Sequence, residues 1–469
     1  MSGVVRRALT AVVPLLVVLG TGTAAAGPVT ATTPREAIRQ VAAAPGPDGR
    51  LTTAATAIVP GTVNRTSLSL NATYSARVRL DVGSRDLRGY VVVTAQNRSG
   101  SGIDRMELNT VMARLGGLRL GEVSVDGKAV VPRVDDQTIV VPLGGVLPDG
   151  ATTTVKVRFR ATLRTTLGGS SWLFTRANGI VNLYRWIPWV SKRTPFDRPN
   201  HGDPFVTPVS PHVTLTLITD RPMRVATTGT RTAVSADGLT QVFEAANVRD
   251  LTTALARDYR TVSATVGDNI VRVYYRSGAP ASALLNAAKV ALTKLEARLG
   301  PYPYTTLKIV QTAGGYGMEG PGVAWIPTGV GTANLPYLVT HEVAHQWFYG
   351  LVGNDQAREP FADEAMTDMT ARAVLGMRRG SRCGSAALDR TIYRYSSTCY
   401  YEQVYIQGGN LLADAKQAMG STSFWAAVRD YIADHRWGLS HTSTLLRALD
   451  DATPLDLAAR WRTRFPKVY

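Results

Sequence analysis

The stretch "VTHEVAHQWF", residues 339–348, holds the most informative residues of this chain. It places His341 and His345 four positions apart in a sequence of 469 residues with only six histidines, and Glu342 follows the first of them. Residues four apart on a helix share one face, so both imidazoles can bind a single metal ion. Glu342 projects beside that ion and can take a proton from water there. The stretch predicts a helix with a catalytic zinc site; the alternative is a buried helix face with hydrogen-bonded histidines.

A catalytic zinc site needs a third protein ligand and an open position for water. Glu364 follows His345 after eighteen intervening residues and opens the next predicted helix. We therefore predict one zinc ion held by His341, His345 and Glu364. The alternative for Glu364 is an exposed glutamate favoured by the helix dipole. Asp368, one turn further on, is expected to accept a hydrogen bond from the outer nitrogen of His341 and fix its tautomer. A surface aspartate is the alternative for Asp368.

Helical patterns surround this stretch. The segments 279–300, 335–349 and 361–375 read as amphipathic helices, and each stops at or just before a glycine. A strand is predicted at 307–312, and the remaining chain to residue 469 is mostly helical in pattern. The C-terminal part, residues 259–469, is therefore predicted to be a mainly helical domain.

The preceding residues have the periodicity of strands. "YSARVRLDV", residues 74–82, and "TVKVRFRATL", residues 154–163, alternate apolar with basic or polar side chains. A period of two buries one face of a sheet and leaves the other in water. Residues 51–258 are thus predicted to form an antiparallel β domain, and the fold class is α+β with more than one domain.

The first residues resemble a signal for export. Residues 1–26 have a basic start, an apolar run and small residues at the end, which is the layout of a secretory signal peptide. A membrane anchor is the alternative, but the apolar run is shorter than a bilayer crossing requires. Residues 27–50 are rich in Ala, Pro and Gly and read as a linker. We expect a secreted protein without stable membrane insertion after the signal is removed.

The two cysteines of the chain agree with export. Cys383 and Cys399 can pair only with each other, and an oxidising compartment favours their disulfide. Such a bridge contributes about 3 kcal/mol in the chain-entropy model. Two lone cysteines make a poor zinc site, so a structural role is predicted.

The formal net charge of +17 comes from arginines scattered along the chain without a basic block. A solvated surface is the simplest interpretation, and attraction to an anionic envelope or to acidic peptides is the alternative. Nucleic acid is not an expected partner, whereas peptides are the expected substrates. The sequence makes no prediction of oligomeric state.

The spacing His-Glu-x-x-His, eighteen residues, Glu resembles the aminopeptidase N family of zinc metallopeptidases, which includes leukotriene A4 hydrolase. "YGMEGPG", residues 316–322, is similar to the Gly-x-Met-Glu-Asn signature of that family, and "VYIQGG", residues 404–409, to its Val-Tyr-Glu-Lys-Gly element. The resemblance implies a thermolysin-like zinc peptidase domain over 259–469. It also implies that Glu319 holds the free α-amino group of a peptide, with Gly317 and Met318 beside it. Tyr405 would stabilise the transition state.

The chain departs from the family pattern in three places. Tyr316 replaces the first glycine of the signature, and Gly320 replaces its asparagine. The glutamine that members often supply from the β domain has no clear counterpart, and Asn182 is the only candidate. The chain ends sixty-four residues after Tyr405, so the large helical domain of longer members is expected to be missing.

These observations predict a secreted zinc aminopeptidase with Glu342 as the general base. Two alternatives remain: a zinc endopeptidase with an open cleft, and a secreted binding protein with a vestigial zinc site. Tyr316 and Trp325 are candidates for the first side-chain pocket, or they are ordinary packing residues.

Overall fold

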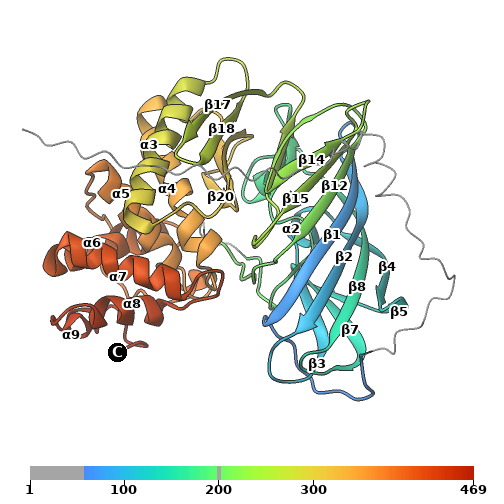
Figure 1. Cartoon of the computed structure of the whole chain (residues 1–469), viewed down its shortest axis with the longest axis horizontal. Helices are drawn as coiled ribbons and strands as arrows, with labels where there is room; N and C mark the ends of the chain where they lie inside the picture. The colour runs from blue at the N-terminus through green and yellow to red at the C-terminus, as the bar shows by residue number, and fades with distance from the viewer. Residues whose placement is uncertain (1–56, 198–201) are drawn as a thin grey trace, which may run out of the picture. The chain divides into compact units, whose positions relative to one another are not determined.

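A computed structural model describes residues 57–197 and 202–469. The expected signal peptide, residues 1–26, and linker, residues 27–50, lie outside the described residues. Residues 55–469 group into one unit by their contacts. Its elements are shown in Figure 1.

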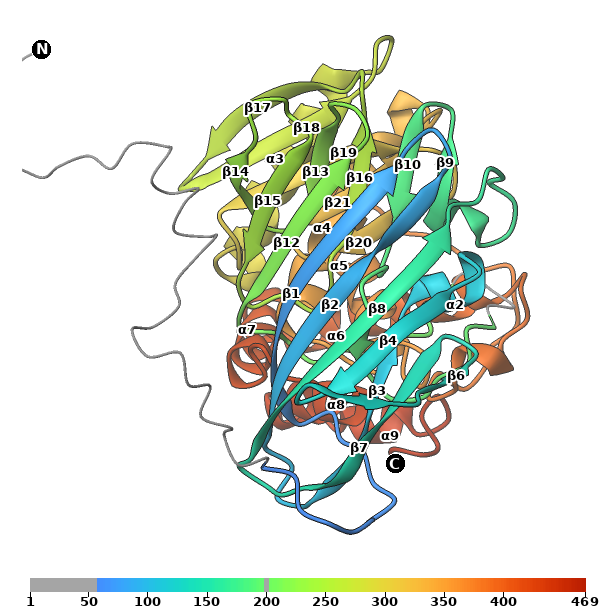
Figure 2. The same cartoon turned by 90° about the vertical axis from the view of Figure 1, so that its right-hand side faces the viewer.

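An eight-stranded sheet dominates the first half, in the order β14-β15-β12-β1-β2-β8-β4-β5 (Figure 2). Its strands are β1 (Leu70–Asp81), β2 (Asp86–Asn97), β4 (Arg119–Val125), β5 (Lys128–Val130), β8 (Thr152–Thr162), β12 (Val213–Thr219), β14 (Thr230–Val234) and β15 (Thr240–Ala245). Side chains alternate strictly between buried and more exposed along β1, as the sequence periodicity predicts. The antiparallel expectation fails at one place, because β1 pairs with β12 in parallel.

Two four-stranded sheets complete this half. One has the order β13-β16-β10-β9 and the other β11-β3-β7-β6. Their strands are β3 (Ile103–Asn109), β6 (Arg133–Asp135), β7 (Thr138–Leu147), β9 (Phe174–Ala177), β10 (Ile180–Leu183), β11 (Trp189–Val190), β13 (Arg224–Thr227) and β16 (Thr253–Ala256), with the short helices α2 (Val111–Leu115) and η1 (Ser171–Leu173) between them.

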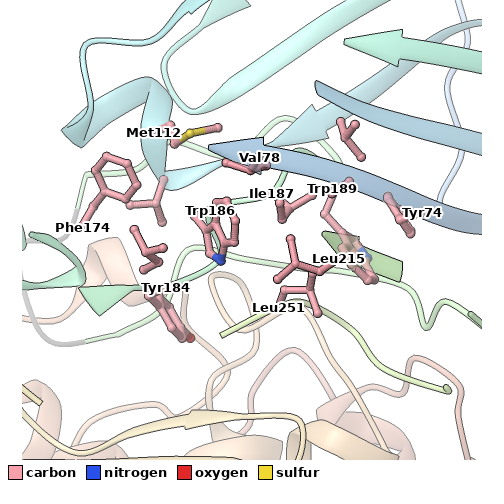
Figure 3. Close-up of a cluster of buried hydrophobic side chains, with 14 of the residues drawn as sticks. Tyr74, Val78, Met112, Phe174, Tyr184, Trp186, Ile187, Trp189, Leu215 and Leu251 are labelled. Carbon is pink, nitrogen blue, oxygen red and sulfur yellow. The ribbon is translucent and has the colours of Figure 1, made fainter. Parts of the chain in front are cut away.

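A core of apolar side chains joins these sheets. Figure 3 shows Trp186 in this core below Val78 of strand β1. The Trp186 side chain is fully buried, and its indole nitrogen donates to the Thr253 hydroxyl at 3.3 Å. The same core includes Met318 and Trp325 from the second half of the chain, so the two halves are packed on each other.

A five-stranded sheet begins the second half, in the order β17-β18-β19-β21-β20. Its strands are β17 (Arg260–Val266), β18 (Asn269–Tyr275), β19 (Thr306–Thr312), β20 (Met318–Gly320) and β21 (Val323–Pro327). The three central strands are parallel, and both edge pairs are antiparallel. The expected domain boundary at residues 258/259 falls between β16 and β17, where the chain enters this sheet. The helix α3 (Ala281–Leu299) connects the parallel strands β18 and β19 and ends at Gly300, whose φ is 93°.

The remaining chain is mostly helical, as predicted. After η2 (Thr332–Asn334) come α4 (Leu335–Ala344), η3 (Gln346–Leu351), η4 (Phe361–Ala365), α5 (Met366–Leu375), η5 (Ile392–Arg394), η6 (Tyr401–Gln407), α6 (Gly408–Met419), α7 (Ser421–Asp434), α8 (Thr442–Asp451) and α9 (Leu457–Trp461). The helix predicted over 335–349 is shorter than expected, because Phe348 and Tyr349 leave the helical backbone region inside η3. Helix α5 ends where predicted, at Gly376 in the left-handed conformation.

Cys383 and Cys399 form the disulfide that the cysteine count predicts. Over residues 57–197 and 202–469, every helix falls short of the length and hydrophobicity that a membrane crossing requires.

Candidate metal centre and substrate cleft

Three predicted ligands converge from the C-terminal part of α4 and from η4. The Nε2 atoms of His341 and His345 lie 3.3 Å apart, and each lies 3.4 Å from Oε2 of Glu364. Wide helical turns in η4 place Glu364 opposite the histidines. All three side chains are buried, so the atoms are held in place by packing.

This triangle has the dimensions of a zinc site. Ligand atoms at about 2.0–2.1 Å from a tetrahedral ion are separated from one another by roughly 3.3–3.4 Å. The measured separations agree with that value on all three edges. Two imidazole nitrogens and one carboxylate oxygen are also a donor set that zinc prefers. The residues therefore fit one zinc ion.

The charges around the triangle favour a cation. Burial alone would lower the pKa of His345, but Asp363, Glu364 and Glu319 raise it well above its ordinary value. Burial would likewise raise the pKa of Glu364, yet His345 and His341 outweigh it and hold this pKa well below its usual range. The buried carboxylates thus stabilise positive charge at the His345 ring. A divalent ion can supply that charge instead of a proton.

The outer nitrogen of His345 is held by a carboxylate that the sequence reasoning missed. Nδ1 of His345 donates to Oδ1 of Asp363 at 2.8 Å, and both side chains are buried. A proton on Nδ1 leaves the lone pair of Nε2 free for a metal. Asp363 is the sequence neighbour of Glu364, and adjacency to a ligand was the signal available to find it.

The prediction that Asp368 accepts a hydrogen bond from His341 is wrong. Nδ1 of His341 has no hydrogen-bond partner among the described residues, and Asp368 does not reach it. Asp368 instead accepts from the Tyr337 hydroxyl and forms an ion pair of 2.6 Å with Arg372, one turn further along α5. An arginine four residues ahead competes for this carboxylate, so the spacing from Glu364 alone misassigned it.

Glu342 lines the cleft beside the triangle. Its carboxylate rests on Gly317, where a Cβ atom would overlap Glu342 Oε1. Gly317 thus makes room for the candidate general base, because a larger residue at this position would collide with it. The sequence did not reveal this requirement for glycine. In the protein alone, burial raises the pKa of Glu342 well above its ordinary value, an effect that His345 opposes.

The candidate amine-binding residue belongs to a buried polar network. Oε1 of Glu319 accepts from the Gln356 amide nitrogen at 3.0 Å, and that nitrogen also donates to Oδ2 of Asp363 at 2.7 Å. The Gln356 amide oxygen accepts from Arg185 at 2.7 Å, and the Arg185 guanidinium lies 3.6 Å from Glu319. Burial, together with Asp203, raises the pKa of Glu319 to about 8. Gln356 therefore connects Glu319 with the carboxylate that holds His345.

Tyr405 lies over one of the predicted ligands. Its ring stacks on the His341 ring at a centroid distance of 5.6 Å and an interplanar angle of 16°. Burial raises the pKa of the Tyr405 hydroxyl well above its ordinary value, and the Glu364 carboxylate raises it further. The hydroxyl is therefore protonated at neutral pH and is available as a hydrogen-bond donor.

One cleft of about 640 Å³ is lined by the three ligands together with Glu319, Glu342 and Tyr405. Met318 lines it beside Glu319, and Tyr316 lines its mouth with 54% of its surface exposed. The first half of the chain contributes Trp172 and Asp203. Pockets of this size accept small molecules and short peptide segments.

Two candidates from the sequence lie elsewhere. Trp325 is fully buried in the core and is a packing residue. The amide nitrogen of Asn182 donates to the carbonyl oxygens of Trp172 and Ala313, so this side chain supports the cleft wall from behind. It is not the amine-binding amide that the family pattern suggested.

No protein-family profile and no curated protein matches the sequence. Solved structures do match. The M1 zinc metallopeptidase of Deinococcus radiodurans aligns with a TM-score of 0.66 and 18% identity over 87% of this chain and 96% of its own. A mutant of that enzyme aligns with a TM-score of 0.67 and 17% identity over 88% of this chain and 97% of its own. The complex of the mutant with a Tyr-Ser-Ala substrate aligns with a TM-score of 0.64 and 18% identity over 87% of this chain and 96% of its own.

The chain therefore has the two-part α+β fold of M1 zinc metallopeptidases. The resemblance to the aminopeptidase N family that the motifs indicate is confirmed at the level of the fold.

Proposed function

We propose that this protein is a secreted, zinc-dependent aminopeptidase that removes N-terminal residues from peptides. The observation that carries the proposal is the placement of the three-atom ligand triangle, Glu342, Tyr405 and Glu319 in one cleft. The fold shared with M1 zinc metallopeptidases supports it. Export rests on the pattern of residues 1–26 and is supported by the disulfide.

One zinc ion would be held by His341, His345 and Glu364. Bound there, it would supply a Lewis acid that acidifies a water molecule and polarises the scissile carbonyl. Asp363 keeps the proton of His345 on Nδ1 and so presents Nε2 toward the ion.

Glu342 acts as the proton carrier. Its buried carboxylate takes the proton of the attacking water and delivers it to the leaving amine. Gly317 leaves the space in which this carboxylate sits. Tyr405 donates a hydrogen bond to the developing oxyanion from its position over His341.

Glu319 binds the substrate's α-amino group. An ammonium opposite this carboxylate makes a charge-assisted hydrogen bond and favours the ionised form of Glu319. The carboxylate is fixed by Gln356 at 3.0 Å, so the peptide terminus is held at a set distance from the triangle. That geometry makes the first peptide bond the one that is cleaved.

The decisive experiment combines a zinc measurement with a matched pair of peptides. Purified protein should contain one zinc per chain, lose activity with a chelator and regain it with zinc. It should cleave a peptide with a free N-terminus and leave its N-acetylated twin intact. Equal cleavage of both peptides would show an endopeptidase, and metal-free, inactive protein would show a vestigial site.

Two variants test the assigned roles. Glu342→Gln should retain zinc and lower kcat roughly 10²- to 10⁴-fold, whereas Glu402→Gln, which removes the same charge from a carboxylate paired with Arg382, should leave kcat unchanged. Glu319→Ala should mainly raise KM for the free peptide.

A further inference from the structure

The exposed face of the eight-stranded sheet carries a row of arginines. Arg79 of β1 lies directly opposite Arg88 of β2, Arg88 opposite Arg160 of β8, and Arg160 opposite Arg119 of β4. All four side chains are exposed, and we call them the arginine row. Adjacent strands lie about 4.8 Å apart, so the row runs for roughly 14 Å across the sheet.

A second line of cations runs beside this row. Arg77 of β1 lies opposite Tyr90 of β2, and Tyr90 lies opposite Arg158 of β8. Lys156 and Arg158 cover the Tyr90 ring at 4.8 and 6.0 Å from its centroid. The cationic surface is thus two side chains wide.

Carboxylates neutralise only part of this surface. Asp86 contacts Arg160 at 2.5 Å and Arg88 at 3.6 Å, and Glu122 contacts Arg158 at 3.7 Å. Arg79 and Arg119 form no ion pair with any residue the structure describes. Like charges directly opposite each other on neighbouring strands destabilise a sheet, so the stability of the sheet alone does not account for the row.

A pocket continues the arginine row at its β4 end. It has a volume of about 590 Å³ and is lined by Arg119 and Arg160 of the row together with Arg85 and Arg164. Nη1 of Arg85 donates to the carbonyl oxygen of Leu163 at 3.1 Å. Nε of Arg164 donates to the carbonyl oxygen of Leu115 at 2.6 Å. Carbonyl acceptors orient a guanidinium without cancelling its charge, so the pocket is fixed and positively charged.

We propose that the arginine row and this pocket bind a linear polyanion of repeating phosphate groups that carries no bases. Guanidinium groups bind phosphate oxygens in pairs, and a row of them suits evenly spaced phosphates better than a single anion. The pocket would hold one end or one bend of the polymer. The other face of the same strands is buried in the core, so the polymer lies outside the peptide cleft.

The chemistry of the face disfavours other polyanions. Single-stranded nucleic acid binds through exposed aromatic rings that stack on its bases, and the Tyr90 ring is already covered by cations. Insertion into an anionic membrane needs protruding apolar side chains, whereas the aliphatic residues of β1, β2 and β8 point into the core, apart from the half-buried Val92.

The test measures binding of long-chain inorganic polyphosphate to the full chain at two salt concentrations. Tight binding that grows with chain length, exceeds that of triphosphate and weakens as salt rises is the expected result. Tighter binding to single-stranded DNA or to anionic phosphatidylglycerol vesicles than to polyphosphate would overturn the proposal. Equal binding of triphosphate and the long chain would overturn it as well.

A pair of triple variants locates the site. Arg79→Gln with Arg88→Gln and Arg119→Gln should weaken polyphosphate binding roughly tenfold or more and flatten its salt dependence. The control removes the same charge from exposed arginines of α8, α9 and the residue after α9: Arg447→Gln, Arg460→Gln and Arg462→Gln. Equal weakening by both triples would show attraction to net charge only and would overturn the site.

Peptidase activity provides a check on folding. The arginine row lies outside the cleft, so the row variant should cleave peptides at the rate of the unchanged protein. If the triple variant fails to fold, the single variant Arg88→Gln carries the test, because its neighbours Arg79 and Arg160 then lose the central cation of the row. Unchanged polyphosphate affinity in that folded variant would count against the proposal.

Discussion

Oδ1 of Asp363 accepts a hydrogen bond of 2.8 Å from Nδ1 of His345, and this contact fixes which ring nitrogen faces the metal triangle. The carboxylate comes from the residue directly before the ligand Glu364, so one wide helical turn supplies both a ligand and the support for another ligand. The support of His345 and the position of Glu364 are therefore not independent.

Removal of this support should weaken zinc binding. Asp363→Ala leaves Nδ1 of His345 without its acceptor, and loss of such a partner lowers metal affinity by about 10- to 100-fold. A competition titration against a zinc-binding dye measures the change. Asp368→Ala is the matched control, because Asp368 contacts Tyr337 and Arg372 instead of a ligand. Equal losses in both variants would contradict the assignment.

Gln356 should act on substrate affinity more than on turnover. Gln356→Met keeps the volume of the side chain but removes the donor to Glu319 and Asp363 and the acceptor for Arg185. We expect KM for a free N-terminal peptide to rise roughly tenfold because Glu319 loses the bond that fixes it, with a smaller change in kcat because Asp363 keeps its contact with His345. Gln403→Met is the control, since that amide bonds to Gly384 away from the cleft. A fall in kcat with unchanged KM would argue for a different role.

Gly317 should be required for the position of the base. In Gly317→Ala the new methyl group overlaps the Glu342 carboxylate, which must move. A displaced general base costs at least 10²-fold in kcat, while zinc content stays the same because no ligand is touched. Gly331→Ala supplies the comparison: Gly331 has a φ of −62° and open space around its Cα. Full activity in the Gly317 variant would exclude this packing argument.

Lys308 should give the protein a pH-dependent stability. Burial lowers the pKa of its ammonium group to about 8, and Arg272 adds to the effect. Between pH 8 and the ordinary lysine value the unfolded chain binds more protons, so this residue's destabilising effect decreases as the pH rises.

The variant Lys308→Met removes that effect. Removing the buried charge should raise the free energy of unfolding by about 3 kcal/mol. Loss of the hydrogen bond from Lys308 to the Gly229 carbonyl offsets about 1 kcal/mol of this gain. Urea unfolding at pH 7 should therefore show a more stable variant, with the gain shrinking toward pH 10. A gain that is constant with pH would show that charge burial is not its cause.

The sequence predicted those parts of the site that depend on short spacing. His341, His345 and Glu364 are linked by a fixed count of residues, and helices ending at Gly300 and Gly376 follow from the freedom of glycine at a helix end. Alternation along β1 predicted its buried face in the same way, because the period of a strand is a local property.

Contacts between distant segments were not accessible in this way. The parallel pairing of β1 with β12 leaves the alternation unchanged, so nothing in the periodicity distinguishes it from antiparallel pairing. The network of Arg185, Gln356 and Glu319 joins three segments that only the tertiary fold brings together. Asp368 was assigned to His341 because its contact with Tyr337 depends on how α5 packs against α4, which spacing does not show.

The covalent bridge from Cys383 to Cys399 closes a loop next to the cleft, where Thr398 and Tyr401 form part of the wall. Glutathione and similar thiols cut such a bond, so a chain kept in reducing surroundings would have this wall tethered at fewer points. The geometry of this part of the cleft would then depend on the redox conditions in which the chain is kept.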